Sequence, residues 1–182
     1  YSGFFYEISK GAICAGNVFE DCDQSVFVLN SCDVQIYQNT FVNSPVCIRR
    51  DLRSAVADHF GWHPATGPDV DKRFGHVFVN NLLVGDKNFK MPLLLVGQHP
   101  DLCGKLKDSP LKQMDYNVMV QDPESPNKIL TRWSPSNITG SSGNCEIAID
   151  SLEDLKKVFD GSSTNSQFYN DLNLQVFKSR EL

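Results

Sequence analysis

Short runs of apolar residues alternate with polar turns along the first part of the chain. Three such runs are Phe4–Tyr6, Val26–Leu29 and Val46–Ile48. Polar or glycine-containing stretches, such as residues 20–24, separate them. Short apolar runs bounded by turn residues are typical of β-strands that are joined by tight turns. The pattern therefore predicts an all-β chain with many short strands.

A segment that contains an asparagine recurs along the chain. It has four copies, of which the last is loose: Gly11–Phe19, Asp33–Phe41, Gly75–Leu83 and Met114–Met119. Asn17 and Asn39 lie 22 residues apart, and we interpret the 42 residues between Asn39 and Asn81 as about two periods. Repeats of this length, made of short strands, are typical of a parallel β-solenoid in which each repeat forms one turn.

The recurring asparagine has a physical reason to lie at a bend between strands. Asparagine tolerates the left-handed backbone conformation, and its amide can bond backbone groups. When turns stack, such amides form a ladder along the solenoid. We therefore expect a structural role for these asparagines rather than a catalytic one.

Two segments depart from the repeat. Residues 49–76 are charged and carry two prolines, which predicts a long loop excursion. Long loops on a rigid scaffold are disproportionately functional. Ser151 and Asp154 form a helix-capping pattern, so we predict a short C-terminal helix over residues 151–160. Apolar and polar residues alternate over 172–177, which predicts a closing strand.

The length and charge of the chain narrow its class. A chain of 182 residues suits a single domain, and a net charge of −5 offers no electrostatic footprint for nucleic acid. No apolar stretch approaches the length of a membrane span. The strand pattern begins with the first residues. We therefore predict that residues 1–182 form the C-terminal portion of a longer protein, and that an upstream segment completes the solenoid.

The six cysteines fall at positions 14, 22, 32, 47, 103 and 145, without a zinc-binding spacing. We favour buried structural thiols, because cysteine is among the most buried residue types. An even number of cysteines is also compatible with disulfides, so the redox compartment stays open.

Most of the chain follows one series of strand and turn residues. The series comprises Phe5–Ile8, Gly16–Phe19, Asn30–Val34, Asn39–Phe41, Asn80–Gly85, Asp115–Asn117 and Asn173–Phe177. It resembles right-handed parallel β-helix proteins that act on carbohydrates and have a pectate-lyase-like fold. The closest likeness is to β-helix glycoside hydrolases of the β-xylosidase type. The resemblance implies a right-handed parallel β-helix with a glycan substrate.

The resemblance assigns a catalytic carboxylate to Glu7. A second carboxylate would lie one coil later, at Leu29–Asn30, where this chain is not acidic. The partner of Glu7 must therefore come from a preceding coil or from Asp33. Neighbouring coils stack about 4.8 Å apart, close to the roughly 5 Å that separates the carboxyl groups of retaining glycosidases. The other interpretation is that Glu7 pairs with an arginine or bonds backbone groups.

The excursion and its flanks supply the candidate substrate-binding residues, which are Arg50, Trp62, Arg73 and His76. Trp62 could stack on a sugar ring while the arginines bond hydroxyl or carboxylate groups, or it could anchor the loop to the solenoid. His59 and His63 lack the acidic residue of a metalloprotease motif, and we assign no metal site. Calcium could bind through the acidic residues near 20–23 and 69–71, without an EF-hand spacing.

Two classes of function follow. The first is a secreted or periplasmic glycoside hydrolase that uses carboxylates, with a polysaccharide lyase as its variant. The second is a non-catalytic solenoid that binds polysaccharide or acts as an adhesin. An acidic neighbour of Glu7 would favour the enzyme, and its absence would favour binding.

Overall fold

The computed structural model describes residues 1–53, 68–136, 145–159 and 165–170. In this part the chain is mostly β-sheet with one short α-helix, so the prediction of an all-β chain is confirmed. The strands form three sheets, named here A, B and C. Sheet A contains β1 (Ser2–Glu7), β4 (Gln24–Leu29), β7 (Val46–Arg50), β10 (Leu94–Gln98), β13 (Thr131–Trp133) and β14 (Ile147–Ile149). Sheet B contains β2 (Lys10–Ala15), β5 (Cys32–Tyr37), β8 (His76–Val79) and β11 (Leu111–Asp115). Sheet C contains β3 (Val18–Glu20), β6 (Thr40–Val42), β9 (Leu82–Gly85), β12 (Val118–Gln121) and β15 (Gln167–Tyr169).

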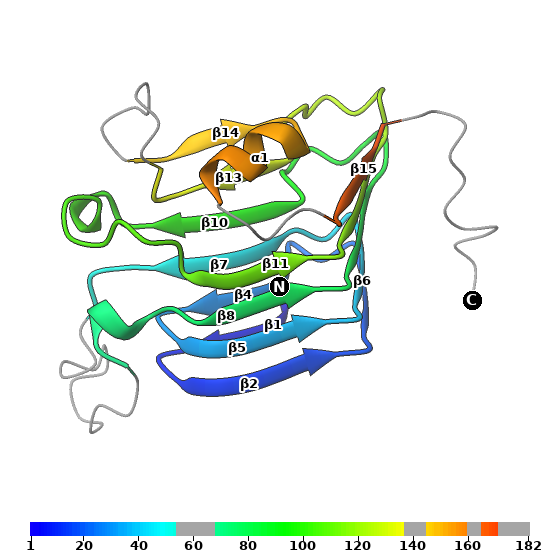
Figure 1. Ribbon diagram of the computed structural model, residues 1–182. Coiled ribbons are helices and arrows are strands. Elements are labelled where there is room, and N and C mark those ends of the chain that lie inside the picture. Colours follow the sequence, from blue (N-terminus) through cyan, green and yellow to red (C-terminus); the bar gives the residue numbers. More distant parts are fainter. Residues whose placement is uncertain (54–67, 137–144, 160–164, 171–182) are drawn as a thin grey trace.

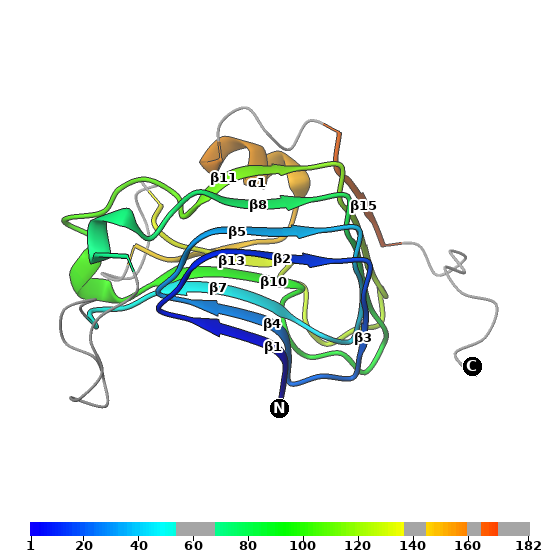
Figure 2. The same cartoon turned by 90° about the horizontal axis from the view of Figure 1, so that it is seen from below.

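The chain visits the three sheets in a fixed order, A then B then C, and repeats it. We call one such passage a circuit, so β1, β2 and β3 form the first circuit, and β10, β11 and β12 form the fourth. Strands of successive circuits pair in parallel, and Figures 1 and 2 show them stacked side by side around a common interior. Parallel neighbours need a crossover between them. Here the strands of the other two sheets provide it.

The interior is filled by apolar side chains in rows that run along the stack. Phe19, Phe41, Leu83 and Met119 hold equivalent positions in sheet C. Cys14, Ile36, Phe78 and Met114 form the corresponding row in sheet B. Phe41 stacks on Phe19 with ring centroids 5.3 Å apart. Because every strand sends alternate side chains inward, each circuit buries its apolar face only against its neighbours.

The predicted asparagine ladder is confirmed at the corner between sheets B and C. Asn39 Oδ1 accepts hydrogen bonds from Asn17 N and Nδ2 at 3.1 and 3.0 Å. Asn81 Oδ1 accepts from Asn39 in the same way, and Asn117 Oδ1 accepts from Asn81. The left-handed backbone lies one residue earlier than we predicted. It occurs at Gly16, Gln38, Asn80 and Tyr116, whose φ angles are 70°, 55°, 55° and 55°.

One part of the period prediction was wrong. Asn39 and Asn81, 42 residues apart, belong to adjacent circuits rather than to circuits two periods apart, because they are directly hydrogen-bonded. The extra residues lie in the connection from β7 to β8, which contains the 3-10 helix η1 (Val70–Lys72). The excursion predicted over 49–76 thus overlaps β7 at its start and His76 of β8 at its end.

The far end of the stack is closed by the helix α1 (Leu152–Val158) and by β14, whose pairing with β13 is antiparallel (Figure 1). Ser151 caps the helix, because its hydroxyl accepts a hydrogen bond from Asp154 N at 3.1 Å. Leu155 is fully buried, and Phe159 packs on Trp133 at a ring-centroid distance of 5.2 Å. The closing strand predicted over 172–177 lies outside the described residues. No helix in the described ranges is long and apolar enough to cross a membrane.

Candidate functional site

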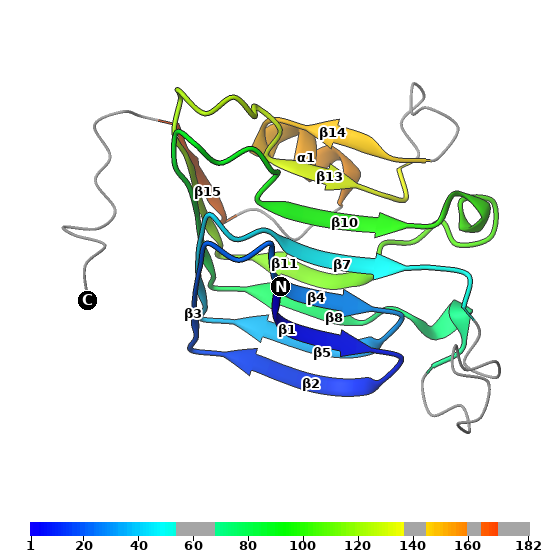
Figure 3. The same cartoon turned by 180° about the vertical axis from the view of Figure 1, so that it is seen from behind.

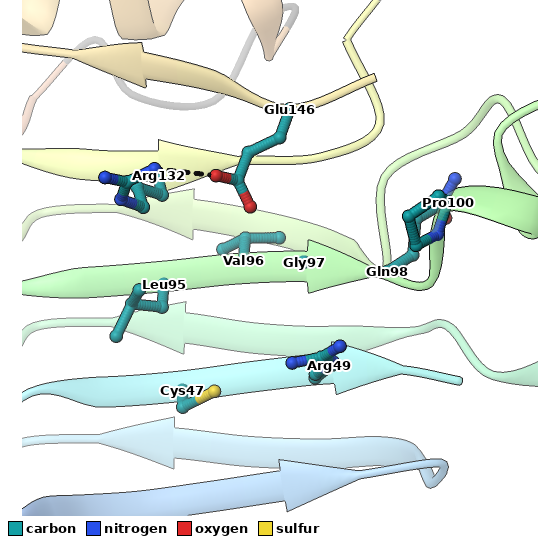
Figure 4. Close-up of a pocket in the computed structure, with 9 residues that line it drawn as sticks. All are labelled: Cys47, Arg49, Leu95, Val96, Gly97, Gln98, Pro100, Arg132 and Glu146. Carbon is teal, nitrogen blue, oxygen red and sulfur yellow. Dashed lines mark hydrogen bonds and ion pairs between the residues drawn. The ribbon is translucent and has the colours of Figure 1, made fainter. Parts of the chain in front are cut away.

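The outer face of sheet A carries a pocket with charged walls, shown close up in Figure 4. It lies across β7, β10 and β13 and reaches the residues just before β14. The residues that line it are Cys47, Arg49, Leu95, Val96, Gly97, Gln98, Pro100, Arg132 and Glu146. Figure 3 shows the strands of sheet A one above another from β1 to β14, so the pocket crosses several circuits.

Strand register explains why residues distant in sequence meet there. Cys47, Leu95 and Arg132 are register partners, so their side chains leave the sheet on the same face. Arg49 and Gly97 are partners two residues further along β7 and β10. Side chains two residues apart on a strand share a face. Both rows therefore face outward, while Val46 and Ile48 point into the core.

The pocket is hollow because of Gly97. A Cβ built on Gly97 would meet no atom within 4 Å. Figure 4 shows Gly97 between Arg49 on β7 and Glu146 beyond β13. A side chain at this position would therefore extend into the open space of the pocket.

Among the described residues, one of the two guanidinium groups in the pocket is paired with a carboxylate and the other is not. Arg132 Nη1 lies 2.8 Å from Glu146 Oε1, so these two groups form an ion pair. Arg49 is exposed, and no hydrogen-bond or ion-pair partner of its guanidinium is found in the described ranges. The pocket therefore presents one guanidinium whose hydrogen-bond donors are available to an anion.

Cys47 also lines the pocket, and its thiol stays protonated at neutral pH. Burial raises the pKa of the Cys47 thiol to about 11, although the charge of nearby Arg49 acts in the opposite direction. Only a thiolate attacks readily, so a thiol with this pKa is inert near neutrality. Cys47 contributes apolar surface.

A disulfide holds the wall of the pocket. Cys103 and Cys145 are bonded, and Cys145 directly precedes Glu146. Gln98 Nε2 donates to the Cys145 sulfur at 3.5 Å and to Leu106 O at 3.0 Å. The expectation of buried structural thiols is confirmed for Cys14, Cys32 and Cys47 and is wrong for the bonded pair; Cys22 is free but only partly buried.

The carboxylate assigned by resemblance, Glu7, lies at the corner where sheet A leads into sheet B. Glu7 Oε1 is 2.5 Å from Arg53 Nη1, so the interpretation in which Glu7 pairs with an arginine describes its contact. Arg53 Nε also contacts Asp51 Oδ2 at 3.1 Å. The guanidinium of Arg53 thus joins two carboxylates, and the second is Asp51 rather than Asp33.

Asp33 lies elsewhere at this corner, at the start of β5. It has a left-handed φ of 55°, and its carboxylate faces Gly75 on the next circuit, where a Cβ would lie 2.3 Å from Asp33 Oδ1. Asp51 is held by more bonds. Burial raises the pKa of Asp51, but hydrogen bonds from the Arg53 backbone and Asn30, with the Arg53 charge, outweigh burial and lower it below its usual value.

Two predicted substrate-binding residues are buried in the same corner. Arg73 is fully buried and donates to Asn30 Oδ1 and to Asp51 O, each at 2.8 Å, and to Arg53 O. His76 is 2% exposed, and its Nδ1 accepts from Val34 N at 3.2 Å. Burial lowers the pKa of His76 to about 4, so the imidazole is neutral near pH 7. In this arrangement both side chains bond protein groups.

Arg50 is also buried, with 4% exposed, and donates to Gln98 Oε1 and to Asp108 O. Burial lowers the pKa of Arg50 to about 10, while Asp108 raises it. Trp62, the remaining candidate, lies outside the described residues, as do His59 and His63. In the described part of the chain, no group of three His, Cys, Asp or Glu side chains could hold a metal ion.

The site residues predicted from the sequence did not include Arg49, Gly97, Arg132 or Glu146. The alternation in Val46–Arg50 could have indicated that Arg49 faces outward, but the residues opposite it come from strands whose register the sequence does not reveal.

Comparison with protein-family models, with curated proteins and with solved structures found no match.

Proposed function

We propose that the chain forms a right-handed parallel β-helix and binds an acidic polysaccharide along the outer face of sheet A. The repeated order of the three sheets supports the helical architecture. Crossovers between parallel strands of one sheet are right-handed in about 98% of cases, which supports the hand.

One observation carries the proposal of an anionic ligand. The exposed guanidinium of Arg49 borders the open space over Gly97. A guanidinium binds a carboxylate through two parallel hydrogen bonds, a geometry suited to the carboxylate of a uronic acid. We infer that Arg49 binds the sugar carboxylate while Arg132 and Glu146, already paired, offer donors and acceptors to sugar hydroxyls.

The rest of the outer face suits an extended chain of sugars. Phe5, Phe27, Cys47, Leu95 and Arg132 form one register row across sheet A. The row spans four strand spacings, roughly 19 Å. Phe5 is 54% exposed, and its ring lies 5.4 Å from that of Phe27. Aromatic faces are suitable stacking surfaces for sugar rings. The glycan would therefore run along the stack, from Phe5 toward Arg132.

Secretion or a periplasmic location belongs to the same proposal. The Cys103–Cys145 disulfide supports it, because disulfides form and persist mainly in oxidising compartments.

Glycoside hydrolysis is the second candidate, and the pair Glu7 and Asp51 favours it. Glu7 Oε1 and Asp51 Oδ2 contact two nitrogens of one guanidinium, so these two oxygens lie at most about 8 Å apart, an upper bound that is compatible with the separations of about 5 to 9.5 Å that glycosidases use. Asp51, with its lowered pKa, would be the ionised carboxylate of the pair. Arg53 neutralises both groups, which is why we place binding first.

Titration with polygalacturonate tests the binding proposal. We expect Arg49→Gln to weaken binding by about 10- to 100-fold, since a charge-assisted hydrogen bond contributes roughly 1.5–3 kcal/mol. Gly97→Phe should abolish binding by filling the pocket, with the melting temperature unchanged or raised. Lys112→Gln, an exposed lysine on β11 of sheet B, is the control with the same loss of charge. Equal affinity of wild type and Gly97→Phe would overturn the proposed site.

The same polysaccharide separates the enzymatic alternatives. Hydrolysis releases new reducing ends only, whereas a lyase also produces an unsaturated uronate with ultraviolet absorbance. We expect Glu7→Gln and Asp51→Asn to abolish any hydrolysis while leaving binding at the Arg49 pocket intact. Hydrolysis that survives in Glu7→Gln would exclude this residue from the chemistry.

A further inference from the structure

The first circuit presents the edges of three strands. In the described residues, β1 pairs only with β4, β2 only with β5 and β3 only with β6. Figure 2 shows β1, β2 and β3 outlining this end of the molecule. Unpaired strand edges expose rows of backbone donors and acceptors that can pair with another strand.

The asparagine ladder is incomplete at this end. Asn39, Asn81 and Asn117 are at most 2% exposed, and each Oδ1 accepts hydrogen bonds from the preceding circuit. Asn17 is exposed and donates to Asn39 in the regular way. In the described ranges its own Oδ1 accepts no hydrogen bond. By the pattern of the ladder, Asn17 Oδ1 would accept a hydrogen bond from a backbone N–H of one more circuit.

The apolar interior is also open here. Phe4, Tyr6, Ala12 and Phe19 are only partly buried. Their register partners one circuit later, Val26, Val28, Val34 and Phe41, are at most 1% exposed. The first circuit covers these four partners, and one more circuit would cover Phe4, Tyr6, Ala12 and Phe19 in the same way.

The other end of the stack is already covered by α1 and by the antiparallel strand β14. A second copy therefore has no parallel circuit to offer in a head-to-tail arrangement. The strand register at the start of β1 favours a different occupant of the exposed edges. Because Ser2 pairs with Gln24, Tyr1 lies beside Asp23. A residue before Tyr1 would lie beside Cys22, at the corner where a circuit ends.

We propose that the first circuit is a docking face for one more parallel circuit of about 22 residues, supplied by a polypeptide segment that leads into Tyr1. Its three strands pair with β1, β2 and β3, and its ladder residue, an asparagine, donates to Asn17 Oδ1. The inference rests on the proposed β-helix and is independent of the glycan.

The chain contains a suitable probe for the test. Residues of the second circuit lie 22 positions after their partners in the first, so a copy of Asp23–Ser44 placed directly before Tyr1 has the correct register. We expect this extension to slow hydrogen exchange of residues 2–20 by about tenfold or more and to raise the melting temperature. Asn17→Ala should lower the melting temperature by several degrees in the extended protein and by much less in the original chain.

Two controls make the result decisive. A scrambled copy of the same 22 residues should protect nothing, and a labelled Asp23–Ser44 peptide added separately should bind if the fused copy aggregates. Unchanged exchange of residues 2–20 with an unprotected extension and no peptide binding would overturn the proposal. So would a dimer of the original chain that already protects these residues, because a second copy would then be the occupant. Polygalacturonate titration of the extended protein tests the glycan site separately.

Discussion

At the residue scale, polar side chains of the corner between sheets A and B form a network with few free groups. Arg73, with no exposed surface, bonds Asn30 and three backbone carbonyls. Asn30 in turn exchanges hydrogen bonds with Asp51. A buried charge is tolerated only when such partners satisfy it. The network therefore fixes both the start and the return of the long connection between β7 and β8.

His76 gives this corner a pH dependence. Its pKa of about 4 in the folded chain lies below the usual 6.5, so between these values the unfolded chain binds a proton that the folded chain does not. The free energy of unfolding should then fall as pH drops from 6.5 to 4, by about 3 kcal/mol in total. His76→Gln keeps an acceptor for Val34 N and should flatten this slope in urea titrations at several pH values.

The matched control is His99→Gln, because His99 has a partly exposed side chain on the surface. That variant should keep the wild-type slope. A wild-type slope in His76→Gln would show that other groups cause the acid sensitivity.

At the element scale, two connections that lead from sheet A to sheet B, β7 to β8 and β10 to β11, differ in what fastens them. Arg73 ties the connection from β7 to β8. The Cys103–Cys145 disulfide ties the connection from β10 to β11, which contains the 3-10 helix η2 (Pro100–Leu102), to the segment before β14. Pro100 and Glu146 of the pocket lie close to this bond along the chain. The disulfide therefore stabilises both the fold and the proposed sugar site.

Replacing both bonded cysteines, as Cys103→Ser with Cys145→Ser, tests this role. The disulfide spans 42 residues of sequence, so its loss should lower the free energy of unfolding by roughly 4 kcal/mol on a chain-entropy estimate. Affinity for polygalacturonate should also fall, because Glu146 loses its fixed position. Cys22→Ser, at a free and partly exposed thiol, is the control. Equal melting temperatures of the double variant and the control would contradict the prediction.

Some of the strands could be predicted from the sequence, and others could not. The asparagine repeat revealed β2, β5 and β8, because each circuit places one asparagine at the same point after a strand of sheet B. The excursion concealed that Asn39 and Asn81 are neighbours, since an insertion lengthens the chain without changing the register of the strands it joins. The pocket was not predictable for the same reason. Its residues lie on strands separated by connections of unequal length, and only the assembled register brings Arg49 opposite Gly97.

At the scale of the whole molecule, stability is shared between neighbouring circuits. Each circuit buries its side chains only against the circuits beside it, so stability is close to a sum of nearest-neighbour terms. A change in the middle of the stack disturbs two interfaces, whereas a change at the first circuit disturbs one. Position in the stack, rather than residue type alone, should therefore decide the effect of a ladder substitution.

Asn81→Ala and Asn17→Ala make this comparison with the same change of side chain. Asn81 accepts from Asn39 N and Nδ2 and donates to Ile36 O and Asn117 Oδ1. Its loss should leave buried backbone groups unpaired, lowering the free energy of unfolding by about 2–4 kcal/mol. Asn17 is exposed, so water can replace its bonds, and the loss there should be about 1 kcal/mol or less. Urea unfolding measures both, and hydrogen exchange should show faster opening on both sides of Asn81. Equal destabilisation by the two variants would mean that the ladder does not couple the circuits.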